Sequence, residues 1–337
     1  MNIEYVILFT IFLALVFDFI NGFHDAANSI ATIVTTRVLK PQYAVAWAAF
    51  FNFVAFLVFD QAVAHTVGKG VIDPNIIDVW VIMAALVGAI TWNVFTWYVG
   101  LPSSSSHALI GGLVGSAVIK SGFGSLNGAG LGKIIVSIVA SPVIGMLLGF
   151  LIMNITKALV YRMPPRKING IFHKLQLVSA AFYSLGHGGN DAQKTMGIIA
   201  VLLSTTSLTI FPGLNVAKDY TAMPIWIVLS CQVAMGLGTL FGGWRIVKTM
   251  GMGLTRLKTI GGFSAETAGA ITLFAATHLG IPVSTTHTIT GSILGVGSVT
   301  EVRKVRWGVA GRIVWAWIFT IPASALVAAA WWKILHQ

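Results

Sequence analysis

The chain alternates between long apolar runs and short polar segments. Four runs are long enough for a membrane-spanning helix of about 20 residues: residues 43–64, 133–161, 223–243 and 309–332. Two more, residues 4–36 and 174–204, exceed one straight span and carry glycine and polar residues in their middle. We predict that these two runs form discontinuous helices, broken at residues 22–25 and 186–191.

Two further apolar regions are interrupted by a proline followed by hydroxyl side chains. Pro102 and Pro282 cannot continue a preceding helix but suit the start of the next one. Serine and threonine follow at capping positions. We therefore predict two helical hairpins with their tips at membrane depth, formed by residues 80–98 with 106–119 and by residues 263–279 with 287–299.

The second half of the chain repeats the first. The polar cluster around Asp25 returns around Asp191, and the Pro102 tip returns at Pro282, in the same order. Each half would contain a broken helix, a span, a hairpin that returns to its own side, and a last span. These give three net crossings per half, so the second half enters from the opposite side.

The fold class that follows is an all-α polytopic membrane protein with two inverted repeats, each with a discontinuous helix and a re-entrant helical hairpin. We assign residues 1–161 to the first inverted repeat and residues 174–337 to the second. Residues 162–173 would be a basic cytoplasmic linker between them.

Composition and charge agree with this interpretation. Only 9% of the residues are charged, against about 25% in soluble domains, so lipid must cover most of the surface. The net charge of +11 resembles that of a nucleic-acid-binding protein, but basic residues of membrane proteins collect in cytoplasmic loops. With both termini outside, most lysines and arginines fall in the inner loops. We expect a multi-pass protein of the cell (inner) membrane and no nucleic-acid partner.

Ionisable residues within the apolar runs are candidates for function, because charge at the bilayer centre costs roughly 2.5 kcal/mol or more. Asp25 and Asp191 lead, since each lies in a repeated motif. His107 and His287 either join the site or bond to the hairpin backbone. Asp18 and Glu266 either act in transport or pair with basic groups. The full set is Asp18, His24, Asp25, His107, His187, Asp191, Lys194, Glu266 and His287.

The two hairpin tips together have the features of an anion site. A helix N-terminus offers free N–H groups and a positive dipole end, and hydroxyls add neutral donors. Tips from inverted halves would converge on one centre. The candidate substrate-binding residues are Ser103, Ser104, Ser105, Ser106, Ser284, Thr285 and Thr286.

Electrostatics predicts coupling between this anion and cations. An oxyanion beside Asp25 and Asp191 in low dielectric is repelled strongly. Cations must therefore enter with it, either as protons on the carboxylates or His24, or as Na⁺. The candidate Na⁺ ligands are Asp25, Asn28, Asn190 and Asp191.

These motifs resemble the inorganic phosphate transporter (PiT) family over essentially the whole chain. The resemblance rests on residues 21–28 (NGFHDAAN), residues 189–197 (GNDAQKTMG) and the two Pro-to-His tips. It implies a symporter of inorganic phosphate with H⁺ or Na⁺, inverted repeats and a homodimer. It places phosphate at the Ser/Thr tips and cations near Asp25, Asn28, Asn190 and Asp191, with His107, His287, Lys194 and Glu266 in support.

One departure from the pattern concerns the coupling ion. His24 stands where many Na⁺-coupled members carry asparagine, and it resembles the bacterial low-affinity permease branch, which is proton-coupled and carries metal-phosphate. We therefore favour H⁺. A sulfate or other oxyanion symporter of the same family remains the alternative substrate assignment.

Two other classes of protein fit the sequence less well. A serine hydrolase would pair Ser104 or Ser106 with His107, but neighbours on a helix point about 100° apart, and no nucleophile elbow with a separate base occurs. We therefore expect no enzyme and no cofactor beyond the transported ion. A passive anion channel conflicts with the buried aspartates, and a counterflow assay separates it from a carrier.

Overall fold

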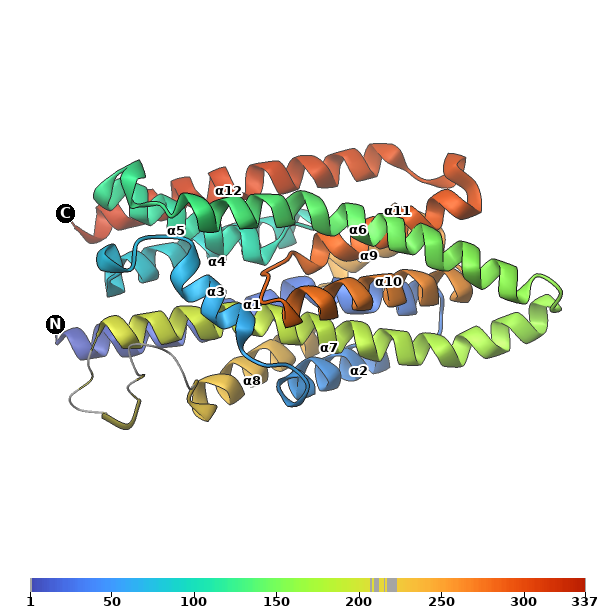
Figure 1. Cartoon of the computed structure of the whole chain (residues 1–337), viewed down its shortest axis with the longest axis horizontal. Coiled ribbons are helices and arrows are strands. Elements are labelled where there is room, and N and C mark those ends of the chain that lie inside the picture. The colour runs from blue at the N-terminus through green and yellow to red at the C-terminus, as the bar shows by residue number, and fades with distance from the viewer. Residues whose placement is uncertain (1, 207, 209–211, 215, 217–222, 337) are drawn as a thin grey trace.

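The computed structural model describes residues 2–206, 208, 212–214, 216 and 223–336, and almost all of them are helical (Figure 1). The first half contains α1 (Ile3–Thr35), α2 (Pro41–Phe53), α3 (Ala62–Gly70), α4 (Val79–Val99), α5 (Ser105–Ser121) and α6 (Gly128–Val160). The second half contains α7 (Pro165–Thr205), α8 (Ile225–Phe241), α9 (Trp244–Gly253), α10 (Thr259–His278), α11 (Thr285–Glu301) and α12 (Trp307–Leu335).

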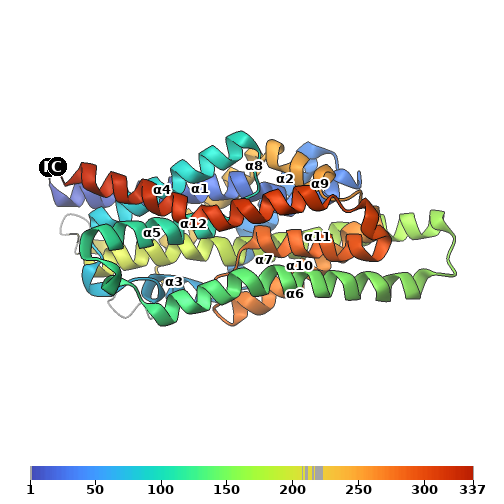
Figure 2. The ribbon, with the colours of Figure 1, turned by 90° about the horizontal axis from the view of Figure 1, so that it is seen from above.

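Several of these helices can cross a membrane. Within the described residues, α1, α4, α6 and α12 are long and apolar enough, and two bent pairs raise the total to as many as six spans. The first pair, α2 with α3, bends by 85°, and the second, α8 with α9, bends by 71°. The helices lie side by side along one axis, and both chain ends lie at the same end of the bundle (Figures 1 and 2).

Each half therefore has a discontinuous helix, but not where the sequence pattern placed it. The predicted breaks at 22–25 and 186–191 are wrong, because α1 and α7 run through both segments as continuous helices. The glycines there serve close packing instead. A Cβ on Gly22 would lie 2.2 Å from the Met235 carbonyl oxygen of α8, and one on Gly188 would lie 2.4 Å from that of Asn52.

The two predicted hairpins are present, and their tips have the same construction. Gly100 and Gly280 end the first arms with φ of 70° and 66°, the left-handed conformation that glycine adopts without strain. The side chains of Ser104 and Ser284 cap α5 and α11. Each accepts a hydrogen bond from the backbone N–H three residues further along, that of His107 at 3.3 Å and that of His287 at 3.2 Å. The α4–α5 and α10–α11 hairpins are thus copies of one unit.

The two halves run in opposite directions. The α4–α5 hairpin enters from the end that holds the termini, whereas the α10–α11 hairpin enters from the other end, and the tips approach midway (Figures 1 and 2). α1 and α7 also run opposite ways, as do α6 and α12. The predicted fold class, an all-α membrane protein with two inverted repeats, is confirmed.

Each hairpin packs on the last helix of the other half. α5 lies along α12, and a Cβ on Gly115 would lie 2.0 Å from the carbonyl oxygen of Ala325. α11 lies along α6, and a Cβ on Gly295 would lie 2.0 Å from the carbonyl oxygen of Met146. Small residues let helix backbones approach closely in membranes.

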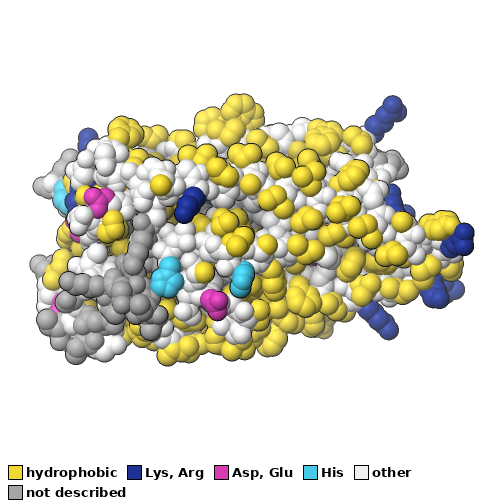
Figure 3. Space-filling view, in the orientation of Figure 1, with side chains coloured by type: hydrophobic (Ala, Val, Ile, Leu, Met, Phe, Trp, Pro, Cys, Tyr) yellow, Lys and Arg dark blue, Asp and Glu magenta, His cyan; other side chains and the backbone are white. Residues whose placement is uncertain are grey.

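The surface has the distribution expected for a protein embedded in lipid. Hydrophobic side chains cover the visible face along the middle of the bundle, while lysine and arginine side chains stand out mainly at the end away from the termini (Figure 3). Large apolar residues such as Phe12, Leu147 and Leu326 are more than half exposed on the outer helices. A water-exposed face of this kind would aggregate.

Candidate functional site

The hairpin tips meet in the interior of the bundle and bring the predicted hydroxyls together. The rings of His107 and His287 lie 4.5 Å apart, edge to face. Each tip hydroxyl belongs to a side chain that is at most 5% exposed. The buried tip residues are Ser103, Ser104, Ser105, Ser106, Ser284, Thr285 and Thr286.

The Asp25 motif on α1 contacts the first hairpin. The His24 ring bridges two groups, with Nδ1 2.8 Å from Asp25 Oδ1 and Nε2 3.0 Å from Thr96 Oγ1 on α4. Ser103 in turn donates to Thr96 at 2.9 Å. His24 therefore links the Asp25 carboxylate to the first tip through hydroxyl groups.

Hydroxyls of the second tip lie between the two aspartates. Asn28 donates to Thr285 at 3.2 Å and to Thr286 at 2.9 Å. Thr285 donates to Asp191 Oδ2 at 2.9 Å, and Thr286 Oγ1 lies 3.5 Å from Asp25 Oδ1. Asn28, a residue of the first half, thus holds the hairpin tip of the second half.

Lys194 supplies a buried positive charge at the same place. Its ammonium group contacts Asp191, which precedes it by three residues on α7, and donates to Ser106 at 2.6 Å and to the Val283 carbonyl at 2.7 Å. The Asp191 charge is therefore compensated within the protein. The ammonium also touches both tips, where its charge would attract an anion.

Asn190 holds the second hairpin through both atoms of its side-chain amide. Its amide nitrogen donates to Thr277 at 3.0 Å and to the Ile281 carbonyl at 3.3 Å. Its amide oxygen accepts from the backbone N–H of Val283 at 3.3 Å. These bonds fix the approach of the chain to the tip.

Two aspartates and a histidine form a buried cluster whose ligand atoms could hold a cation. Ligand atoms of Asp25, His187 and Asp191 all lie within 4.8 Å of one another, and all three residues are buried. The His187 Nε2 atom lies 3.3 Å from Asp191 Oδ2, while its Nδ1 lies 3.1 Å from Asn52 Oδ1. His187 had no assigned role in the sequence interpretation, although its spacing of four residues before Asp191 places both on one helix face.

Glu266 lies away from the tips and ties three helices together. It accepts hydrogen bonds from Thr32 of α1 at 2.6 Å, and from Gln176 and Ser179 of α7 at 3.0 and 2.5 Å. No basic residue forms an ion pair with it among those described. Three neutral donors stabilise this carboxylate instead.

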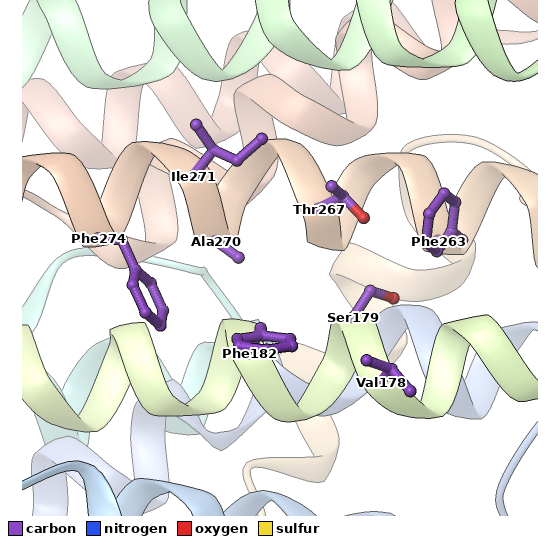
Figure 4. A pocket seen from close by; sticks show the side chains of 8 residues that line it. All are labelled: Val178, Ser179, Phe182, Phe263, Thr267, Ala270, Ile271 and Phe274. Atoms are coloured by element: carbon purple, nitrogen blue, oxygen red, sulfur yellow. The ribbon is translucent and has the colours of Figure 1, made fainter. Parts of the chain in front are cut away.

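A cavity of about 460 Å³ lies between α7 and α10 (Figure 4). Side chains from the two helices face each other across it, and most are apolar. Ser179 lines the cavity and also donates to Glu266. Because this lining offers an anion few donors, we do not assign the cavity to the substrate. It is lined by Val178, Ser179, Phe182, Phe263, Thr267, Ala270, Ile271 and Phe274.

The amino-acid sequence is similar to a known protein family and to several curated proteins. A family model described as "Phosphate transporter family" matches residues 21–169 and again residues 162–328. A "Probable low-affinity inorganic phosphate transporter" of Rhizobium meliloti (strain 1021) is 61% identical, over 94% of this chain and 92% of the relative. A protein of the same description from Bacillus subtilis (strain 168) is 46% identical, over 96% and 95%.

One solved structure shares the fold. It is described as "The sodium-dependent phosphate transporter", and it superposes with a TM-score of 0.85 at 23% sequence identity. The match covers 98% of this chain and 99% of the other. The similarity extends through both halves and both hairpins.

Proposed function

This chain belongs to the phosphate transporter family, and we propose that it is a secondary active symporter that carries inorganic phosphate together with H⁺ or Na⁺. The family is one of transporters, so the expectation that the chain is not an enzyme is confirmed. Beyond membership of the family, we propose the coupling to cations, the binding residues and the assembly.

The observation that carries the proposal is the meeting of two capped hairpin tips beside a buried ammonium group. Helix N-termini and hydroxyls bind tetrahedral oxyanions through neutral donors. Lys194 touches Ser106 of the first tip and the Val283 carbonyl of the second. We assign phosphate to this place, with Ser103, Ser104, Ser105, Ser106, Ser284, Thr285 and Thr286 as its donors.

The coupling cations would bind next to the phosphate. Lys194 forms its ion pair with Asp191 rather than with Asp25, and Asn28 donates to the two tip hydroxyls that bond to these aspartates. We propose as the cation-coupling residues Asp25, Asn28, Asn190, Asp191 and His24, with His187 added to the set. We favour H⁺ as the coupling ion because the His24 ring contacts Asp25 directly. The proposal includes transport of the anion as a metal-phosphate.

The proposal extends to orientation and assembly. Both termini lie at one end of the bundle, and lysines and arginines are prominent at the other, which supports placing the termini outside the inner membrane. Residues 162–173 would then be cytoplasmic and would separate the repeats 1–161 and 174–337. We also propose a homodimer.

The experiment is uptake of labelled phosphate into liposomes that contain the purified protein. A pH gradient or a Na⁺ gradient is imposed separately, and excess sulfate serves as competitor. Uptake driven by the pH gradient and insensitive to sulfate is the expected result. Uptake that only Na⁺ drives would assign the coupling to Na⁺.

Other outcomes would contradict the proposal. Strong competition by sulfate, or uptake of sulfate alone, would establish the alternative oxyanion assignment. Phosphate flux without trans-stimulated exchange would indicate a passive channel. Empty liposomes and liposomes with heat-denatured protein provide the baseline.

A further inference from the structure

Asp18 is a buried carboxylate that no positive charge neutralises. It lies on α1, two helical turns before Asp25, and is 0% exposed. Oδ1 accepts a hydrogen bond of 2.9 Å from Thr195 of α7, whereas the buried Oδ2 has no partner. None of the ion pairs among the described residues includes Asp18.

A neighbouring side chain on α1 also lacks a hydrogen-bond donor. Asn21, one turn further along the same face of α1, interacts with the carboxyl group, yet its Oδ1 is buried without a donor. A buried polar atom without a hydrogen-bond partner destabilises the fold. On this face of α1, two buried acceptor oxygens, Asp18 Oδ2 and Asn21 Oδ1, therefore lack a donor.

The charged neighbours of Asp18 do not donate the missing hydrogen bond. Asp191 and Lys194 of α7 are the charged groups that act on Asp18, but Lys194 contacts Asp191, Ser106 and the Val283 carbonyl. α8 contributes the thiol of Cys231. On α4 the ionisable group is the phenol of Tyr98, near the end that lies away from Asp18.

We propose that Asp18 is a proton-binding residue of the transport cycle, separate from the central site and nearer to the end that holds the termini. The seven residues between Asp18 and Asp25 span about 10 Å of helix. A proton that enters from this end forms an O–H bond at Oδ2, which turns an orphaned acceptor into a donor. The same bond breaks when the proton leaves on the opposite side, so one positive charge crosses with each anion.

A proton suits this place better than a metal ion. Hard metal cations bind about six or more oxygens, and the described acceptors that lack donors near Asp18 are fewer. A proton needs one acceptor and one bond. The inference rests on the proposed function, because a coupling proton has meaning only if the chain is a symporter.

The test measures how many protons accompany the phosphate. Liposomes with wild-type protein or with Asp18→Asn are brought to steady accumulation of labelled phosphate at several pH gradients. Each coupled proton contributes about tenfold to the accumulation ratio per pH unit. We expect Asp18→Asn to lower the slope of the logarithm of this ratio against the pH gradient by one, while phosphate exchange at equal pH continues.

The controls separate this role from a structural one. Asparagine keeps the shape of Asp18 and can accept from Thr195. Asp78→Asn removes a carboxylate far from the tips, together with its ion pair to Lys120. Asparagine can still cap the N-terminus of α4 there, so the slope should stay unchanged. Asp18→Glu keeps an ionisable group and should keep the wild-type slope.

An unchanged slope in Asp18→Asn overturns the proposal, as does a slope that falls against a Na⁺ gradient instead. Should Asp18→Asn lose exchange as well, the infrared spectrum of the wild-type protein decides. A protonated Asp18 gives a carboxylic C=O band that shifts in Asp18→Glu, and the lack of this band overturns the proposal. Absence of phosphate transport by the wild type overturns the proposed function too.

Discussion

His107 and His287 touch each other across the boundary between the two halves, with ring centroids 4.5 Å apart. The His287 ring also stacks on Trp317 of α12 at 3.7 Å, and its Nδ1 lies 3.4 Å from the Ile138 carbonyl of α6. That backbone contact is thus made with another helix rather than with its own hairpin. The pair fixes how closely the two tips approach.

Replacing Asp25 with asparagine should abolish coupled uptake. The change keeps the shape of the side chain but removes the charge that the cation would balance. Loss of a buried charged partner costs roughly 1.5–3 kcal/mol, or about tenfold to more than a hundredfold in uptake at a fixed gradient. Uptake by Asp25→Asn at the wild-type rate under a pH or Na⁺ gradient would refute the assigned role. Asp78→Asn is the matched control.

Thr285→Ala should weaken phosphate binding. The Thr285 hydroxyl connects Asn28 to Asp191 at the second tip, and a hydrogen bond of this kind contributes about 1 kcal/mol or more. We expect the half-saturating phosphate concentration to rise several-fold, and Thr285→Ser to restore it. Thr290→Ala, one turn further along α11, removes a buried hydroxyl that has no partner and should change little. Equal effects at both positions would contradict the assignment.

Lys194→Met should destabilise the protein as well as stop transport. Removing one member of a buried ion pair leaves the other uncompensated, at a cost of roughly 3–5 kcal/mol. Asp191→Asn in the Lys194→Met background should recover part of the lost thermal stability but not the uptake. A double-mutant cycle of melting temperatures in detergent measures this coupling. Strictly additive effects would show that the pair does not act as a unit.

Gly115→Ala should disrupt the contact between α5 and α12. A Cβ at Gly115 would lie 2.0 Å from the Ala325 carbonyl oxygen, which forces the helix backbones apart. Overpacking of this kind costs typically 1–3 kcal/mol, and we expect a lower melting temperature. Gly311→Ala in α12 meets no atom within 4 Å and should be neutral or slightly stabilising. Indistinguishable melting temperatures for the two variants would argue against the packing described here.

The sequence predicted the architecture because its repeated motifs are local. Pro102 and Pro282 stop one helix and start another whatever surrounds them, and Ser104 and Ser284 cap the following helices as expected. The odd number of crossings per half then required inversion. These inferences need no knowledge of tertiary contacts.

The breaks were misplaced because glycine has two uses that a single sequence does not separate. Gly22 and Gly188 lie inside continuous helices and admit a neighbouring backbone. The discontinuity of the second half lies instead at Gly242, where φ is 67°. Only the position of the partner helix distinguishes the two uses.

The sequence pointed to residues that the structure brings together, but not to the pairs that they form. The ammonium of Lys194 neutralises Asp191 and leaves Asp25 with a histidine, so the two aspartates are not equivalent despite the repeat. His187 lies beside both aspartates, and its position four residues before Asp191 could have been read from the sequence. Which carboxylate receives the lysine depends on side-chain geometry.

The exchange of hairpins between the halves has a consequence for how the protein assembles. α5 packs on α12 and α11 packs on α6, and Asn28 holds the tip of the opposite hairpin. A fragment that ends at Tyr161 would thus insert into the bilayer with the glycine face of α5 uncovered and with only one of the two hairpin tips. The two halves, produced as separate polypeptides, would have to find each other in the bilayer before either could bind an ion.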